Sequence, residues 1–397
     1  MDNYANELDQ LLNEDAGSVL RREQSAFDNL LAAAHNRIVL FGSGNLGVIV
    51  LRCLRGAGIE PLAFADNNQA RWGESIDGVS VLSPAEAAKK FGRSALFMVT
   101  IWSVGHSFRQ TREQLSRLGC SRVISSSELR WKFAAELLPA YCQDLPHKVY
   151  EQADEVRAAA LLWADDYSRQ EFLNQVKWRA LGELGALQPP VAEDQYFLES
   201  VFSIVPGEVF VDCGAFDGDT ARQLLSRSRD FSRIFAIEAD PENFRKLREW
   251  AGTLDADLAR RIAPCNVAVA ASRGQLRFNA TGGDGACIAE DGDVVVDCLP
   301  VDELVAESQP TFIKMDIEGF ELDALEGARR VIQEQQPILA ICVYHRQNHL
   351  WRVPLFICSL VQDYHLFLRP HNGDGWDLIC YAVPAKRLRQ SVSGKGV

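Results

Sequence analysis

The sequence lacks the features that would place the chain in a membrane or on a nucleic acid. No apolar run approaches the roughly 18 residues of a transmembrane helix, and the N-terminus is polar and acidic, without a basic start leading into an apolar core. Basic residues are fewer than acidic ones, 41 against 54, and form no cluster. Because phosphate backbones are bound through concentrated positive charge, nucleic acid is excluded as a partner. We therefore expect a cytoplasmic protein that binds neither membranes nor nucleic acids.

Paired cysteines are also missing. The ten cysteines are scattered singly, and no Cys-x-x-Cys pair occurs. This excludes the usual zinc site and the dithiol redox couple, so we assign no metal ligands and expect reduced, mostly buried thiols. What the chain does have is length: its 397 residues are long for one core, which predicts two domains.

The segment Val209–Thr220, VFVDCGAFDGDT, is the most informative part of the sequence. An apolar strand would end at Asp212, and Gly214 and Gly218 would let the backbone pass close beneath a ligand before a helix begins. A dinucleotide loop would need glycines at positions that carry other residues here, and the three acids of the segment would repel a pyrophosphate. The turn instead favours a cationic ligand with ribose and amino groups.

Polar residues also stand at or near the ends of four further strands that we expect along the chain. They are Glu238 after Arg233–Ile237, Asn266 within a strand near Ala263–Ala270, Asp316 and Glu318 after Thr311–Met315, and His345 after Ile338–Tyr344. The carboxyl ends of parallel strands meet at the ligand crevice of a doubly wound sheet. There Glu238 would accept both hydroxyls of a ribose.

Five stretches of the chain, VDCGAFDGDT, IEADPENF, FIKMDIEGFELDALEGA, SLVQDYHLFLRP and WDLICYAVP, resemble the FkbM-type methyltransferase family. The resemblance covers roughly Asp194 to Pro384, and DQYF at Asp194–Phe197 is similar to family sequence too. It implies S-adenosylmethionine as cofactor and O-methylation, often of sugar, glycan or polyketide hydroxyls. The positions that the resemblance and the turn assign to the cofactor are Asp212, Gly214, Ala215, Asp217, Gly218, Thr220, Glu238, Ala239 and Asn266.

Methyl transfer from a sulfonium is an in-line displacement, so the acceptor oxygen must be aligned and must lose its proton. The candidate catalytic residues are Asp316, Glu318 and His345, whose imidazole titrates near neutral pH. The two carboxylates have two open roles, to orient acceptor hydroxyls or to hold a divalent cation. Lys314 would pair with one of them or belong to a buried ion pair. Further side chains that could line an acceptor pocket are His349, Trp351, His371 and Trp376.

A second glycine motif lies near the N-terminus. A strand over Arg37–Phe41 is followed by Gly42, Gly44 and Gly47, then by a helix, a second strand and Asp66. This is a complete G-x-G-x-x-G in its strand–turn–helix context, with an acid at about 20 residues' distance. It predicts a site for NAD or a nucleotide-sugar; the alternatives are a structural or dimerisation role, or glycines that only allow close packing of helix on strand. Hydride transfer is disfavoured because no Tyr-x-x-x-Lys pair occurs.

The expected fold class is α/β, with two doubly wound Rossmann-like domains joined by a helical linker, the C-terminal one a class I methyltransferase fold. The expected parts are an N-terminal helical segment (1–34), a Rossmann-like nucleotide-binding domain (35–128), a helical linker (129–199), a methyltransferase domain (200–385) and a tail (386–397). The expected function is FkbM-type O-methylation of a small-molecule or carbohydrate acceptor. The alternatives are a nucleotide-binding scaffold with a relic methyltransferase domain, and an NAD-linked oxidoreductase or epimerase. A homo-oligomeric state is left open, as is the role of the glycine-rich loop Gly282–Gly292.

Overall fold

The computed structural model describes residues 2–279, 287–288, 292 and 294–389. It divides into two compact units. Unit 1 is Met1–Asp154, Gln170–Pro190 and Asn372–Trp376, and unit 2 is Glu155–Arg169, Val191–His371 and Asp377–Val397. The stretch 129–199, expected as one helical linker, is thus divided between the units. The loop Gly282–Gly292 lies almost wholly outside the described residues.

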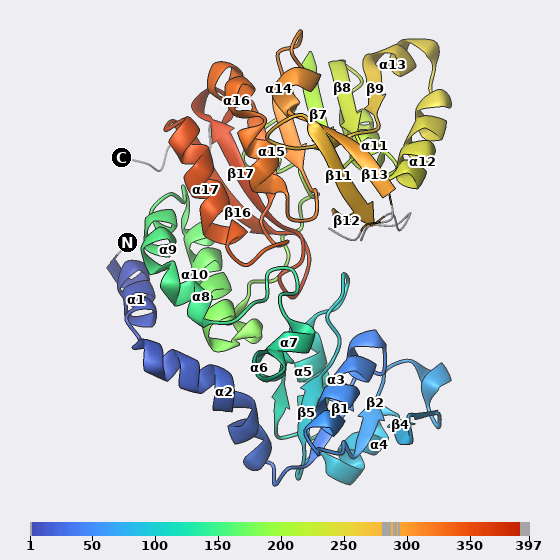
Figure 1. The fold of residues 1–397 in the computed structure, drawn as a ribbon, viewed down its shortest axis with the longest axis vertical. Helices are drawn as coiled ribbons and strands as arrows, with labels where there is room; N and C mark the ends of the chain where they lie inside the picture. The colour runs from blue at the N-terminus through green and yellow to red at the C-terminus, as the bar shows by residue number, and fades with distance from the viewer. Residues whose placement is uncertain (1, 280–286, 289–291, 293, 390–397) are drawn as a thin grey trace. The chain divides into compact units, whose positions relative to one another are not determined.

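Unit 1 is built on a six-stranded sheet of order β3-β4-β2-β1-β5-β6, parallel except for β3 (Figure 1). The strands are β1 (Ile38–Phe41), β2 (Ala63–Ala65), β3 (Ser75–Ile76), β4 (Val79–Leu82), β5 (Leu96–Val99) and β6 (Val123–Ile124). Its helices are α1 (Asp2–Leu12), α2 (Ala16–Ala32), α3 (Asn45–Gly56), α4 (Pro84–Phe91), α5 (Phe108–Arg117), α6 (Ser127–Lys132), α7 (Ala134–Leu137) and α8 (His147–Glu151). The chain starts at the centre of the sheet and winds outward to both sides, as in doubly wound folds.

The continuous apolar run of β1 explains its central place. All four residues are buried, and they alternate between two core clusters: Ile38 and Leu40 belong to one, Val39 and Phe41 to the other. A strand that is apolar on both faces needs cover on both, which helices provide in parallel sheets. Helices α9 (Ala153–Ala160) and α10 (Asp166–Leu181) lie where the chain passes from one unit to the other.

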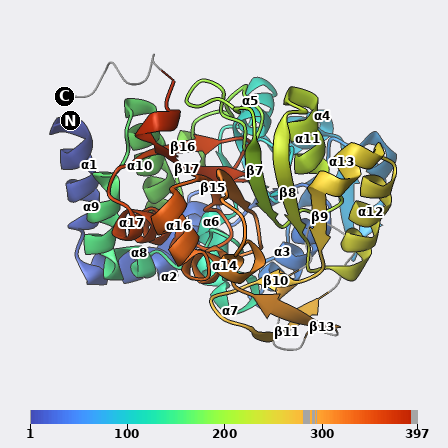
Figure 2. The same cartoon turned by 90° about the horizontal axis from the view of Figure 1, so that it is seen from above.

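Unit 2 contains a seven-stranded sheet of order β16-β17-β15-β14-β7-β8-β9, in which β17 alone runs opposite to the other strands. The strands are β7 (Glu208–Cys213), β8 (Phe231–Ile237), β9 (Ile262–Cys265), β14 (Phe312–Met315), β15 (Ile338–Cys342), β16 (Tyr364–Pro370) and β17 (Leu378–Pro384). The helices are α11 (Asp219–Arg227), α12 (Pro241–Gly252), α13 (Ala256–Arg261), α14 (Val301–Leu304), α15 (Glu321–Glu326), α16 (Arg329–Gln335) and α17 (His349–Leu360). Figure 2 shows β7, β8 and β9 side by side.

A second, four-stranded sheet in unit 2 corrects one prediction. Its order is β10-β13-β11-β12, from β10 (Ala268–Val269), β11 (Gly274–Asn279), β12 (Cys287–Ile288) and β13 (Val294–Leu299). The single strand expected near Ala263–Ala270 is therefore wrong: β9 and β10 belong to different sheets, and the chain changes sheet at Asn266. Within the described residues, every helix falls short of the length and apolarity that a membrane span requires.

Candidate functional site

Two turns meet at the centre of the seven-stranded sheet. Strands β7 and β14 are neighbours, with Asp212 opposite Lys314, and the strand order reverses between them, which is where ligands bind in open α/β sheets. A Cβ on Gly214 would lie 1.9 Å from the carbonyl oxygen of Asp316, and the φ of Gly214 is +79°. Only glycine combines that backbone angle with so close an approach. The turn after β7 is thus in direct backbone contact with the turn after β14.

Lys314 contacts the first turn, which follows β7, and not the second turn, which follows β14. Its Nζ lies 3.1 Å from Oδ1 of Asp212, both side chains are buried, and it donates a hydrogen bond to the carbonyl of Gly214. The expectation that Lys314 pairs with Asp316 or Glu318 is corrected, and its alternative, a buried ion pair, holds. Burial raises the pKa of Asp212 to about 6, although Lys314 favours the ionised form. Asp212 therefore acts on the turn through Lys314, which bonds the carbonyl of Gly214.

Glu238 stands at the end of β8 beside the first turn. Its Oε2 accepts the backbone N–H of Phe216 at 2.8 Å, and its Oε1 accepts that of Asp240 at 2.7 Å. The side-chain amide of Asn266 donates to the carbonyls of Glu238 and Ala239. Burial raises the pKa of Glu238 to about 7. Each carboxylate oxygen can accept a further hydrogen bond, so the carboxylate retains capacity for ligand hydroxyls.

The rest of the predicted cofactor segment forms the start of α11. Gly218, with φ +92°, is the residue before the helix, and a Cβ there would meet the ring of Trp250. Ala215 and Thr220 are buried, and Asp217 forms an ion pair with Arg222. The structure thus groups the nine predicted cofactor positions around the ends of β7, β8 and β9, and their role in binding stays a prediction.

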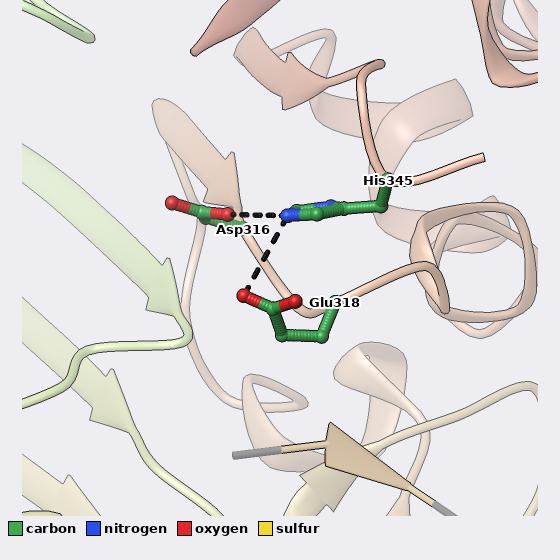
Figure 3. A group of neighbouring side chains, drawn as sticks. All are labelled: Asp316, Glu318 and His345. Carbon is green, nitrogen blue, oxygen red and sulfur yellow. Dashed lines mark ion pairs between the residues drawn. The ribbon is translucent and has the colours of Figure 1, made fainter. Parts of the chain in front are cut away.

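The three predicted catalytic residues form one cluster (Figure 3). Nε2 of His345 lies 3.3 Å from Oδ1 of Asp316 and 3.7 Å from Oε1 of Glu318. The two acids come from the turn between β14 and α15, and the histidine follows β15. The carboxylates are about three-quarters buried, with 24% and 21% of the side chains exposed, whereas the imidazole is fully buried. Glu318 adopts the left-handed φ of +54°, a strained angle for such a residue.

Buried Glu321 contacts both the histidine of this cluster and the turn that carries its two acids. Its Oε1 lies 2.6 Å from Nδ1 of His345, and its Oε2 lies 3.0 Å from Nδ1 of His349. Oε1 also accepts the backbone N–H groups of Ile317 and Gly319. Burial opposes ionisation, but the two histidines hold the pKa of Glu321 well below its usual range. Burial lowers the pKa of His345, but the Glu321 carboxylate outweighs burial and raises that pKa to about 9. The expectation that this imidazole titrates near neutral pH is therefore wrong.

Tyr196 is a member of the site that sequence reasoning did not assign. Its hydroxyl donates to Oδ2 of Asp316 at 2.6 Å, and its backbone N–H donates to the hydroxyl of Tyr381 at 3.0 Å. The available signal was the family-like DQYF segment ahead of β7. Tyr196 thus bonds one carboxylate oxygen of Asp316, and the other, Oδ1, faces Nε2 of His345.

A pocket of about 580 Å³ borders the same turn at Gly319 and Phe320 and is also lined by His349 and Arg346. Of the other side chains expected at an acceptor pocket, Trp351 is fully buried in the core. His371 is bonded to the hydroxyl of Tyr381, and Trp376 belongs to unit 1, where it packs on Trp102 and Tyr141.

The glycine motif of unit 1 has a structural use at two of its three positions. Gly42 has φ +113°, and a Cβ on Gly47 would lie 2.2 Å from the carbonyl oxygen of Gly42, which supports the close-packing alternative there. A Cβ on Gly44 would meet nothing within 4 Å. Asp66 accepts hydrogen bonds from the backbone N–H and the hydroxyl of Ser43. A nucleotide ligand for this loop stays a prediction.

The seven-stranded sheet with one reversed strand, and the acid-rich turn at its switch point, define the class I methyltransferase fold. Residues 212–372 match the family model for the methyltransferase FkbM domain, so this region of the chain is similar to that domain. The match confirms the resemblance seen in the sequence.

The similar solved structures include methyltransferase FkbM from Methylobacillus flagellatus KT, which is 24% identical, has a TM-score of 0.74, and matches over 96% of this chain and 98% of its own. At that identity the likeness shows the fold, and it confirms the α/β class. UDP-D-quinovosamine 4-dehydrogenase from Vibrio fischeri is 20% identical over 25% of this chain and 85% of its own, with a TM-score of only 0.20. No curated protein sequence matches the chain.

Proposed function

We propose that the chain is an S-adenosylmethionine-dependent O-methyltransferase that acts on a hydroxyl of a sugar, glycan or polyketide-like small molecule. The observation that carries the proposal is the contact between the two turns at Gly214 and Asp316. One turn belongs to the cofactor positions and the other to the carboxylate–histidine cluster. Methyl transfer needs the methyl carbon and the acceptor oxygen in line and a few ångströms apart, and neighbouring turns at a switch point meet that need.

The residues fit such a cofactor. Glu238, buried beside the first turn with a pKa that burial raises to about 7, suits a ligand that brings hydroxyl donors. Asp212 and Asp217 are paired with Lys314 and Arg222, whereas exposed Asp219 adds negative charge at the start of α11, which favours a ligand that carries a sulfonium and an ammonium group. S-adenosylmethionine supplies an electrophilic methyl. In the cluster, His345 orients the acceptor hydroxyl, and the carboxylate of Asp316 or Glu318 receives its proton as the oxygen–carbon bond forms and the carbon–sulfur bond breaks.

Calorimetric titration with S-adenosylhomocysteine tests the cofactor half of the proposal. The wild type is expected to bind, Glu238→Ala to bind much more weakly, and Glu242→Gln, an exposed neighbour on α12, to bind like the wild type. Absence of binding by the wild type would contradict the proposal and favour a nucleotide-binding scaffold.

Transfer of a labelled methyl group to a panel of monosaccharides, UDP-sugars and GDP-sugars tests the catalytic half. Asp316→Asn is expected to lose turnover while it still binds S-adenosylhomocysteine, since the acid belongs to the second turn. Wild-type turnover in Asp316→Asn would remove the cluster from the mechanism.

A further inference from the structure

The cluster of Asp316, Glu318 and His345 has the composition of a metal site as well as that of a proton acceptor. One ligand atom from each of the three residues lies within 4.8 Å of the other two. Among the residues that the structure describes, no other group of three or more acid, histidine or cysteine side chains meets that condition. Figure 3 shows Oδ1 of Asp316 and Oε1 of Glu318 both facing the same nitrogen of His345.

The spacing of these atoms suits ligands of a single ion. Two atoms bound at about 2.1 Å in tetrahedral or octahedral geometry lie about 3.0 to 3.5 Å apart. The distances from Nε2 of His345 to the two carboxylate oxygens are 3.3 and 3.7 Å. The third distance, between the ligand atoms of the two carboxylates, is at most 4.8 Å, so the two acids would move closer together for all three atoms to reach one ion.

The surroundings of the cluster orient two of the three ligands in the way that metal sites require. A ligating histidine almost always uses its second ring nitrogen to bond a carboxylate or carbonyl, which fixes the ring. Fully buried Glu321 does this for His345 through Nδ1 at 2.6 Å. Tyr196 holds the other oxygen of Asp316 at 2.6 Å. These contacts come from α15 and from the segment before β7, so they are independent of the cluster itself.

The backbone also directs Glu318 into the cluster. Its φ of +54°, followed by +98° at Gly319, gives a tight turn that a glutamate adopts only at a cost. The N–H of Gly319 and that of Ile317 bond Glu321, so the residue that fixes the histidine also fixes the turn that carries both acids. The three ligand atoms are thus held together by one buried carboxylate.

We propose that Asp316 Oδ1, Glu318 Oε1 and His345 Nε2 bind one divalent cation. A set of two carboxylates and one imidazole suits a first-row ion such as Mn²⁺, which accepts both oxygen and nitrogen ligands. A six-coordinate ion would keep three positions open, enough to bind two adjacent hydroxyls of an acceptor. A cation lowers the pKa of a bound hydroxyl, so with the cation bound the cluster would hold the ion in place of acting as proton acceptor, and the hydroxyl would lose its proton to water before its oxygen attacks the methyl. This role rests on the proposed function, whereas cation binding itself does not.

Titration of the chelator-treated full chain with Mn²⁺, followed by the electron paramagnetic resonance of the free ion, tests the proposal. The wild type is expected to bind about one Mn²⁺ per chain. Glu318→Gln is expected to bind at least tenfold more weakly, and Glu321→Gln about 10- to 100-fold more weakly, because the histidine loses its orienting partner. Glu326→Gln, an exposed acid on α15, is the matched control and is expected to bind like the wild type.

Two results would overturn the site: no saturable Mn²⁺ binding by the wild type, or wild-type affinity in both Glu318→Gln and Asp316→Asn. S-adenosylhomocysteine titrations on the same samples separate this failure from that of the proposed function. If the cofactor product binds and Mn²⁺ does not, only the metal site falls. If Mn²⁺ binds and the cofactor product does not, the proposed function falls and the cation site stands. Restoration of methyl transfer by Mn²⁺ after chelation would support both.

Discussion

Removal of the Lys314 side-chain charge is the sharpest test of how the first turn is held. In Lys314→Met, the Asp212 carboxylate keeps its burial but loses the cation 3.1 Å away. An uncompensated buried charge costs about 3–5 kcal/mol. We therefore expect unit 2 to lose roughly that much stability at pH 8. The loss should shrink as the pH falls, because the pKa of Asp212, already raised to about 6 by burial, rises further in the variant and the neutral acid tolerates burial.

A double-mutant cycle separates the ion pair from the loss of packing. Asp212→Asn combined with Lys314→Met leaves no buried charge, so the double variant is expected to recover most of the stability lost by Lys314→Met. Arg245→Met, which removes an exposed pair on α12, is the control and is expected to melt like the wild type.

Thermal unfolding followed by circular dichroism gives the readout, with urea titration as a second measure. For a domain of this size, 1 kcal/mol corresponds to about 2–4 °C in Tm, so Lys314→Met is expected to melt roughly 6–20 °C below the wild type. A decrease of less than about 2 °C, or a double variant whose loss equals the sum of the two single losses, would refute the reasoning that the pair is coupled.

Three further predictions concern the two turns. Gly214→Ala is expected to lose about 2–5 kcal/mol of stability from its left-handed φ and its clash with Asp316, measured by urea unfolding, whereas Gly44→Ala, with open space around it, should match the wild type. S-adenosylhomocysteine affinity should fall below pH 7, by up to about tenfold per pH unit, as the Glu238 carboxylate takes up a proton; calorimetry on Glu238→Gln should show a flat profile, and an unchanged slope would count against this assignment. Tyr196→Phe should cost about 1–3 kcal/mol by removing its bond to Asp316, and should lower turnover more than cofactor affinity in steady-state assays.

The sequence predicted best what depends on local pattern. Apolar runs ending in polar residues located β7, β8, β14 and β15, because a buried parallel strand must be apolar on both faces. The same reasoning placed Asp316, Glu318 and His345 at strand ends, and the strand ends meet because parallel strands share an edge. The FkbM resemblance rested on such segments, and the family match bears it out.

What the sequence could not predict depends on contacts between distant segments. Lys314 pairs with Asp212 because the register of β14 against β7 sets them opposite each other, and register is not visible in either strand alone. Tyr196 reaches Asp316 across 120 positions of chain. The split at Asn266 was missed because a side-chain amide that caps the carbonyls of Glu238 and Ala239 looks, in the sequence, like any polar residue in a strand.

The contact at Gly214 changes how the glycine turn is explained. From the sequence, this glycine would exist so that the backbone can pass close to a ligand. In the structure, the carbonyl oxygen of Asp316 occupies the space that a Cβ on residue 214 would need. The glycine therefore allows the second turn to contact the first. Because Lys314, from the strand before the second turn, also bonds the carbonyl of Gly214, the first and second turns are fixed relative to each other. A side chain at Gly214 would therefore separate the proposed cofactor from the proposed cluster, and methyl transfer should fail even where each half still binds its own ligand.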